Sequence, residues 1–204
     1  MDGLKQRAIK GVTWNAIQSL TNKSISFLFL IFMARLLLPA DYGMVGMLAV
    51  FIALADAFVN CGFGQAIIRK QDRTQTDEST VYYFSITASL ICYAIIYIIA
   101  PFVGDFYNMP ELSPLLRFLG LKIVISSLSS MHVLRYSIEL NFKKPSIVKV
   151  CSNILSGIIG LYLAFSGYGV WALAIQQVLM ALFSTILYII ISNWQPIWVF
   201  SWSS

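Results

Sequence analysis

Long, almost uninterrupted apolar runs dominate the chain. A membrane-spanning helix needs about 20 consecutive, mostly apolar residues, and six stretches meet that requirement. They are residues 11–38, 42–61, 80–103, 114–134, 146–165 and 168–192. The runs are continuous rather than alternating, which favours helices over the strands of a membrane barrel. The pattern predicts an all-α, polytopic membrane protein, with one six-transmembrane-helix bundle over residues 1–192.

Polar side chains recur inside these runs at helical spacing. In the first run they are Asn15, Gln18, Ser19, Asn22, Lys23 and Ser26. The fourth run places Lys122, Ser126, Ser129 and Ser130 on one face, and the fifth does the same with Lys149, Ser152, Asn153 and Ser156. A lysine at the bilayer centre costs roughly 2.5–3.5 kcal/mol on insertion scales. These faces are therefore predicted to look at protein or water rather than at lipid.

Three interpretations of the polar faces stay open. Serine and asparagine side chains join helices within a membrane. Lys23 forms an ion pair with Asp56, the one acid inside the second run, or Asp56 binds a coupling cation or proton. A hydrated cationic cavity accounts for more of these polar residues, because an ion pair between Lys23 and Asp56 would leave Lys122 without an acidic partner inside the membrane. Such a cavity suits an anionic solute or a phosphate-bearing lipid headgroup.

The charged residues orient the bundle. The chain has 204 residues, of which 58% are hydrophobic and only 11% charged. A soluble globule of this size could not bury so much apolar surface, so the composition excludes a cytosolic enzyme and a nucleic-acid-binding protein. Ten of the 14 lysines and arginines fall in the N-terminus, around residues 69–73 or within residues 135–149. The positive-inside rule then predicts that both termini are cytoplasmic.

Catalytic and metal-binding patterns are missing from the sequence. His132 is the single histidine, so no two-histidine metal motif exists, and we expect no enzyme activity, no metal and no cofactor. The three cysteines are isolated, as in packing residues. In the tail, residues 193–204, tryptophans recur every four residues at Trp194, Trp198 and Trp202. This spacing predicts a short helical segment at the membrane interface, or the start of a linker.

Three short segments resemble a known family. Residues 33–43 read Met-Ala-Arg-Leu-Leu-Leu-Pro-Ala-Asp-Tyr-Gly, residues 62–70 read Gly-Phe-Gly-Gln-Ala-Ile-Ile-Arg-Lys, and residues 10–14 read Lys-Gly-Val-Thr-Trp. They are similar to segments of the polysaccharide flippases of the multidrug/oligosaccharidyl-lipid/polysaccharide superfamily, which export O-antigen, colanic acid and teichuronic acid precursors. The resemblance covers essentially the whole chain but only one lobe, the N-terminal one, of a two-lobed transporter.

The resemblance implies a location and an activity. It implies a multi-pass protein of the bacterial inner membrane that moves undecaprenyl-diphosphate-linked oligosaccharide to the outer leaflet, among membrane lipids. The chain is then expected to be a truncated lobe that lacks its C-terminal partner lobe, or a half-transporter that pairs with a second copy. Alternatives are a scaffold subunit that binds a glycan polymerase or glycosyltransferases, and a cation-coupled drug exporter.

The resemblance also implies a substrate site. Mapped onto this chain, the family's cationic cavity is lined by Lys23, Lys122 and Arg117, which hold the diphosphate. The polar residues that share these faces complete the expected substrate site: Asn15, Gln18, Asn22 and Asn153.

Overall fold

A computed structural model describes residues 2–59, 74–139, 143–192 and 194–196. Every regular element in these ranges is a helix. The helices are α1 (Asp2–Leu36), α2 (Pro39–Val59), α4 (Gln75–Phe106), α5 (Leu112–Ser127), α6 (Ser130–Ile138), α7 (Lys143–Phe165) and α8 (Val170–Ile191). The all-α prediction is confirmed.

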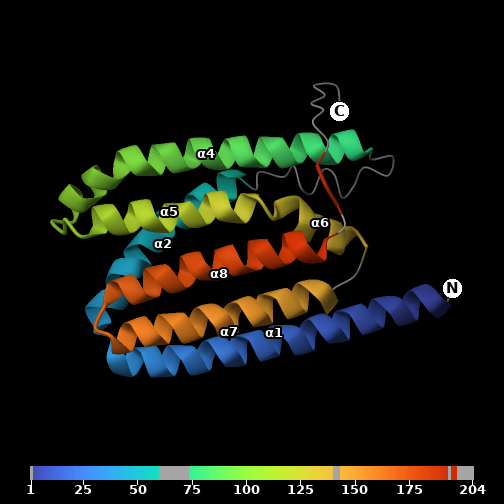
Figure 1. Cartoon of the computed structure of the whole chain (residues 1–204), viewed down its shortest axis with the longest axis horizontal. Helices are drawn as coiled ribbons and strands as arrows, with labels where there is room; N and C mark the ends of the chain where they lie inside the picture. The colour runs from blue at the N-terminus through green and yellow to red at the C-terminus, as the bar shows by residue number, and fades with distance from the viewer. Residues whose placement is uncertain (1, 60–73, 140–142, 193, 197–204) are drawn as a thin grey trace.

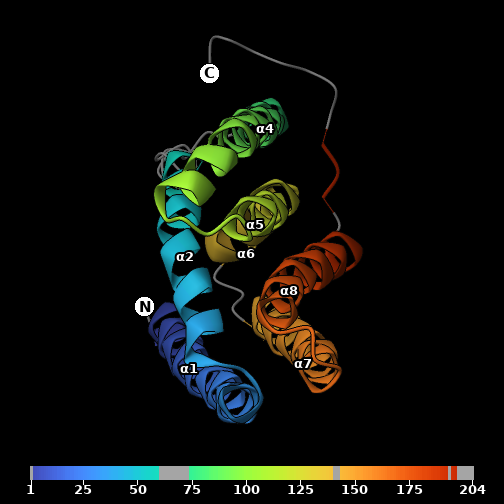
Figure 2. The ribbon, with the colours of Figure 1, turned by 90° about the vertical axis from the view of Figure 1, so that its left-hand side faces the viewer.

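Five long helices form a curved row, and a sixth crosses it. The row runs α1, α7, α8, α5, α4, each packed on the next (Figures 1 and 2). Helix α2 leans across one face of the row and contacts α4, α5 and α8. Helix α1 packs mainly along α7, so it forms one edge of the molecule.

The connections alternate between two ends of the bundle. The α1–α2, α4–α5 and α7–α8 connections meet at one end, on the left of Figure 1, which we name the turn end. The start of α1, the start of α4, helix α6 and the end of α8 lie at the opposite end, which we name the N-terminal end. Two of the three basic regions found in the sequence, the N-terminus and the basic residues of α6 and α7, belong to helices at that end. Residues 69–73 lie outside the described residues.

Short polar motifs start two of the helices. Pro39 opens α2, where its missing N–H costs nothing, and the Leu38 N–H donates to the Asp41 carboxylate at 2.9 Å. A complete capping box starts α4: Asp77 N–H donates to Thr74 Oγ1 at 3.3 Å, and Thr74 N–H donates to Asp77 Oδ2 at 2.8 Å. These contacts satisfy N–H groups that a helix start leaves open.

The dry core lies towards the turn end. Leu48 and Ile52 of α2 pack there against α4 and the first half of α5, and Leu112, Leu115 and Leu116 are fully buried. Large apolar side chains also cover the outside, as expected where lipid is the solvent. Val50, Leu54 and Phe58 of α2, Ile98 and Phe102 of α4 and Ile190 of α8 are all more than half exposed.

Most of the predicted spans have a helix that is long and apolar enough to cross a membrane. These helices are α2, α4, α7 and α8, and α5 with α6 would make a fifth as one bent span. Helix α1 is not among them, although its 35 residues exceed the length of a span. Its polar face lowers its hydropathy. Five of the six predicted spans thus correspond to helices of suitable length and composition, counting α5 with α6 as one. The span predicted for the first run stays a prediction.

The sequence predicts one continuous helix for the fourth run, but the structure divides it into α5 and α6. The chain bends by 45° between α5 and α6, at Leu128 and Ser129. The run Ser-Ser-Leu-Ser-Ser stands at the bend, and serine hydroxyls compete for the carbonyls that a straight helix would use. The Ser129 and Ser130 hydroxyls donate to the carbonyls of Ser126 and Ser127 at 3.0 and 2.8 Å.

The predicted helical tail is wrong where the structure describes it. Residues 194–196 are not helical, and Trp194 is buried against Met131 of α6 and Tyr82 of α4. The backbone of Ser192 is already extended, and Pro196 disfavours a helical conformation at the residue before it. Trp198 and Trp202 lie outside the described residues.

Candidate functional site

A groove runs between α1 and α7 towards the N-terminal end. Its volume is about 610 Å³, and we name it the basic groove. Its lining is Ser19, Asn22, Lys23, Ser26, Phe27 and Leu30 of α1, with Lys149 of α7. Both lysines are exposed, and the lining contains no acid among the residues whose side chains the structure describes. The groove therefore combines positive charge, hydroxyl and amide groups, and an apolar stretch along one helix.

One buried amide holds the floor of this groove. Asn153 of α7 is only 4% exposed, and its Nδ2 group donates to Asn22 Oδ1 at 3.1 Å and to Ser26 Oγ at 2.9 Å. Buried polar side chains in a membrane protein are paired in this way because lipid offers them no hydrogen bonds. Asn153 therefore fixes the α1 face that presents Lys23, and it supports the groove from beneath.

The structure separates the residues expected to form one cationic cavity. Asn22 and Lys23 line the basic groove and Asn153 supports it. Lys122 and Arg117 are on α5, outside that lining. Arg117 lies over the Tyr97 ring at 4.2 Å, and its Nε donates to the Tyr97 carbonyl at 3.3 Å. It is held against α4.

Two further predicted site residues are on α1. Asn15 and Gln18 belong to this helix, but their side chains lie outside the part of the chain whose burial and contacts the structure describes. Helical spacing puts them on the face of Asn22 and Lys23, and their place in the site stays a prediction.

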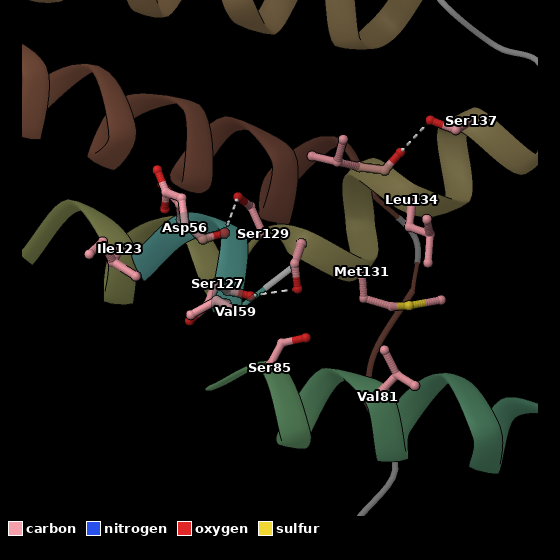
Figure 3. A pocket seen from close by; sticks show the side chains of 13 residues that line it. Asp56, Val59, Val81, Ser85, Ile123, Ser127, Ser129, Met131, Leu134 and Ser137 are labelled. Carbon is pink, nitrogen blue, oxygen red and sulfur yellow. Dashed lines mark hydrogen bonds between the residues drawn. The ribbon is translucent and has the colours of Figure 1, made fainter. Parts of the chain in front are cut away.

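A second pocket lies at the bend between α5 and α6. We name it the bend pocket; its volume is about 360 Å³ (Figure 3). Its polar lining is Asp56 of α2, Ser85 of α4, Ser126, Ser127, Ser129 and Ser130 at the bend, and Ser137 of α6. The charge of Lys122 on α5 acts on the Asp56 carboxylate. The alternative Lys23–Asp56 pair stays a prediction.

Two features of these sites escaped prediction from the sequence. The sequence places Lys149 on the polar face of Asn153, four residues away, but Lys149 is not among the residues expected to form the substrate site. The sequence also predicts a straight helix through the serine run at 126–130. Four serines in five residues are a signal for a bend, because each hydroxyl offers the backbone an alternative partner.

The remaining residues with metal-binding or catalytic potential form no further site in the part of the chain that the structure describes. Within the described ranges, no group of three or more histidine, cysteine, aspartate or glutamate residues could hold a metal. His132 is buried among aromatic rings, with Trp194 at 5.3 Å and Tyr82 at 6.4 Å between ring centroids. This environment is that of a packed side chain.

The fold and the sites define the class: an all-α, multi-pass membrane protein with a basic groove and a separate acidic pocket. Comparison of sequences gives the family. The chain belongs to the family described as "Polysaccharide biosynthesis protein", which matches residues 32–204. The predicted family is thereby confirmed.

Individual relatives agree with this assignment. The chain is 25% identical to the teichuronic acid biosynthesis protein TuaB of Bacillus subtilis, over 98% of this chain and 42% of that protein. It is 24% identical to the lipopolysaccharide biosynthesis protein WzxC of Escherichia coli, over 76% and 31%. It is 22% identical to the succinoglycan biosynthesis transport protein ExoT of Rhizobium meliloti, over 94% and 39%.

The chain thus spans 31–42% of the length of these relatives. No solved structure matches it significantly.

Proposed function

We propose that this chain is a membrane lobe of a transporter that moves a lipid-linked, diphosphate-bearing oligosaccharide across the bacterial inner membrane. Family membership and the names of the relatives, which include a transport protein and two biosynthesis proteins, support the proposal. The substrate is relocated and not chemically changed, so the protein acts as a transporter rather than as an enzyme.

The basic groove is the observation that carries the proposal. An undecaprenyl-diphosphate-linked sugar has an anionic centre, a hydroxyl-rich head and a long apolar chain. The ammonium groups of Lys23 and Lys149 suit the phosphates, Ser19 and Asn22 suit sugar hydroxyls, and Phe27 with Leu30 suits the start of the lipid. The groove shields the charged head from hydrocarbon. Contact of that charge with hydrocarbon is the chief energetic barrier to crossing the membrane.

The orientation of the lobe follows from its charges. With both termini in the cytoplasm, the N-terminal end and the mouth of the basic groove face the leaflet in which the substrate is made. Alternating access requires two units that rock against each other. The second unit is either the part of the relatives that this chain does not span or a second copy of the chain.

Lipid binding tests the proposal directly. The purified chain in nanodiscs is titrated with a fluorescent undecaprenyl diphosphate. We expect Lys23→Gln and Lys149→Gln each to weaken binding on the order of tenfold, because each removes one charge from a partly desolvated phosphate site. Lys143→Gln is the matched control, since Lys143 is exposed and lies outside the groove. Undecaprenol, which lacks phosphate, should bind far more weakly.

Three outcomes would count against the proposal. Equal affinity for undecaprenyl diphosphate and undecaprenol would contradict a phosphate-binding site. Equal affinity of all three lysine variants would contradict the assignment of the binding site to the basic groove. A chain that inserts normally but binds no lipid would favour the scaffold function.

A further inference from the structure

A cation is fixed between α4 and α5 in the half of the bundle nearer the turn end. Arg117 lies in the second turn of α5, and the centre of its guanidinium is 4.2 Å from the centre of the Tyr97 ring of α4. Its Nε group donates to the Tyr97 carbonyl at 3.3 Å. Figure 1 shows these parts of α4 and α5 side by side. Two contacts with one residue therefore hold the guanidinium in place.

The surface around this cation is apolar and exposed. Neither Tyr97 nor Arg117 belongs to the core that packs against α2. Leu90 and Ala94 share the face of Tyr97 on α4 and are exposed, and so is Pro114, one turn before Arg117 on α5. Such a surface contacts acyl chains when the bundle lies in a membrane. Arg117 is therefore placed beside lipid, apart from the basic groove between α1 and α7.

This positive charge has no counter-ion in the described part of the protein. No described acid forms an ion pair with Arg117. A guanidinium has five N–H groups. The Nε–H is bonded to α4, and the four N–H groups of the terminal nitrogens have no hydrogen-bond partner among the described residues. Arg117 stands three residues inside the predicted span 114–134, about 5 Å along the helix. A charge at that depth requires a polar partner.

The geometry of the guanidinium indicates which partner fits. Arginine binds phosphate through two parallel N–H groups, and a guanidinium stacked on an aromatic ring keeps those groups free. Phospholipid headgroups carry phosphate at the membrane interface, which a long basic side chain reaches from a few ångströms below. A headgroup with its own ammonium would bring a second positive charge beside Arg117. An anionic headgroup is therefore favoured.

We propose that Arg117 and Tyr97 form a binding site for an anionic phospholipid of the leaflet at the turn end. The lipid phosphate binds the guanidinium, and an acyl chain lies along the exposed face of Leu90 and Ala94. Leu90 and Ala94 precede Tyr97 on a helix that runs towards the turn end, so the chain points towards the bilayer centre. The bound lipid bridges α4 and α5. This inference does not rest on the proposed transport function.

Photo-crosslinking of lipid to the full chain tests the site. The chain is reconstituted in phosphatidylcholine vesicles with a small share of phosphatidylglycerol that carries a photoreactive group on its headgroup. A phosphatidylcholine with the same group is the reference probe, and mass spectrometry of peptides identifies the attached segments. We expect the anionic probe to attach around Tyr97 and Arg117 at least about threefold more than the reference probe. Arg117→Gln should remove this excess. Arg117→Lys should keep part of it, because it retains the charge but not the fork.

Arg35→Gln is the matched control. Arg35 is exposed in the last turn of α1, at the same end of the bundle, and this variant should keep the excess. If Arg117→Gln does not fold, the comparison of the two probes on the wild-type chain decides. Equal attachment of both probes to the wild type, an unchanged excess in Arg117→Gln, or loss of the excess in Arg35→Gln would each overturn the proposal.

Competition distinguishes the possible sources of phosphate. Unlabelled phosphatidylglycerol should displace the probe, and inorganic phosphate should not. Displacement by inorganic phosphate would overturn the lipid site in favour of a site for a soluble anion. Displacement by undecaprenyl diphosphate at a much lower mole fraction than phosphatidylglycerol would overturn it in favour of the transported lipid. A chain that keeps the excess here but binds no undecaprenyl diphosphate would retain this site and refute the transport function.

Discussion

At the scale of single residues, two adjacent buried positions on α7 are expected to have opposite effects on stability. Asn153 is buried and bonds to two side chains of α1. Ser152, one residue earlier, is fully buried, and its hydroxyl has no hydrogen-bond partner among the described residues. A satisfied buried group stabilises a structure modestly, whereas an unsatisfied one costs free energy.

Asn153→Ala should therefore lower the free energy of unfolding by about 1 kcal/mol, the size of an interhelical hydrogen-bond contribution in membranes. Ser152→Ala should leave stability unchanged or raise it. Heating in detergent followed by size-exclusion chromatography with fluorescence detection ranks the two variants. If Ser152→Ala is the more harmful change, the assignment of these two side chains is wrong.

At the scale of elements, close approach of α7 and α8 depends on a glycine. A Cβ atom at Gly160 would lie 2.8 Å from Gln176 Cβ of α8 and 2.9 Å from Met33 Cε of α1. The methionine end can rotate away, but a Cβ atom moves only with its backbone. The three helices α1, α7 and α8 therefore meet at a place where no larger residue fits.

Gly160→Ala should lower stability by about 1–3 kcal/mol, the usual cost of overpacking. Gly46→Ala of α2 is the control. Open space surrounds that position, so the better helix propensity of alanine should hold or raise stability by up to about 1 kcal/mol. The same heating assay compares them, and equal loss in both variants would contradict the packing argument.

The bend between α5 and α6 is the second element-scale feature. Thr185→Val keeps the shape of the side chain but removes the hydroxyl that binds the Ile125 carbonyl. We expect a loss of about 1 kcal/mol and a smaller bend. Spin labels on α5 and α6 would report the bend as a longer distance between their outer ends. An unchanged distance would mean that the serines alone hold the bend.

Helix positions were predictable from the sequence, while the partition of polar residues was not. Runs of apolar residues located α2, α7 and α8 to within three residues, because the bilayer requires continuous hydrophobicity over a fixed length. Helices α4 and α1 begin 5 and 9 residues before their predicted runs, because their first turns are polar. Spacing along one helix also placed Asn22, Lys23 and Ser26 on a common face. Which face meets which helix depends on packing between distant segments. The sequence alone could not show that Lys149 of α7 shares a groove with Lys23 of α1.

At the scale of the whole molecule, the bundle differs between its two ends. Apolar side chains of α2, α4 and α5 fill the core towards the turn end. The polar lining of the bend pocket lies nearer the N-terminal end, around the junction of α5 with α6. The bundle is therefore apolar inside at one end and more polar inside towards the other.

The membrane orientation of this asymmetry can be measured. In a variant without native cysteines, Gln71→Cys and Lys143→Cys should react with a membrane-impermeant maleimide only after cells are opened. Asn108→Cys and Ser166→Cys, in the connections of the turn end, should react in intact cells. The expectation follows from retention of basic loops in the cytoplasm. Labelling of position 71 or 143 in intact cells would contradict the predicted cytoplasmic location of these segments.

The pairing of α1 with α7 sets a timing problem for synthesis. The asparagine that satisfies Asn22 is 131 residues further along the chain, and ribosomes add about 5–20 residues per second. For on the order of ten seconds, the first helix is made but its partner is not. During that interval its amide and lysine side chains need water, lipid headgroups or an insertion factor as substitutes. Slowing translation between α2 and α7 should therefore expose α1 to quality-control proteases before the lobe is complete.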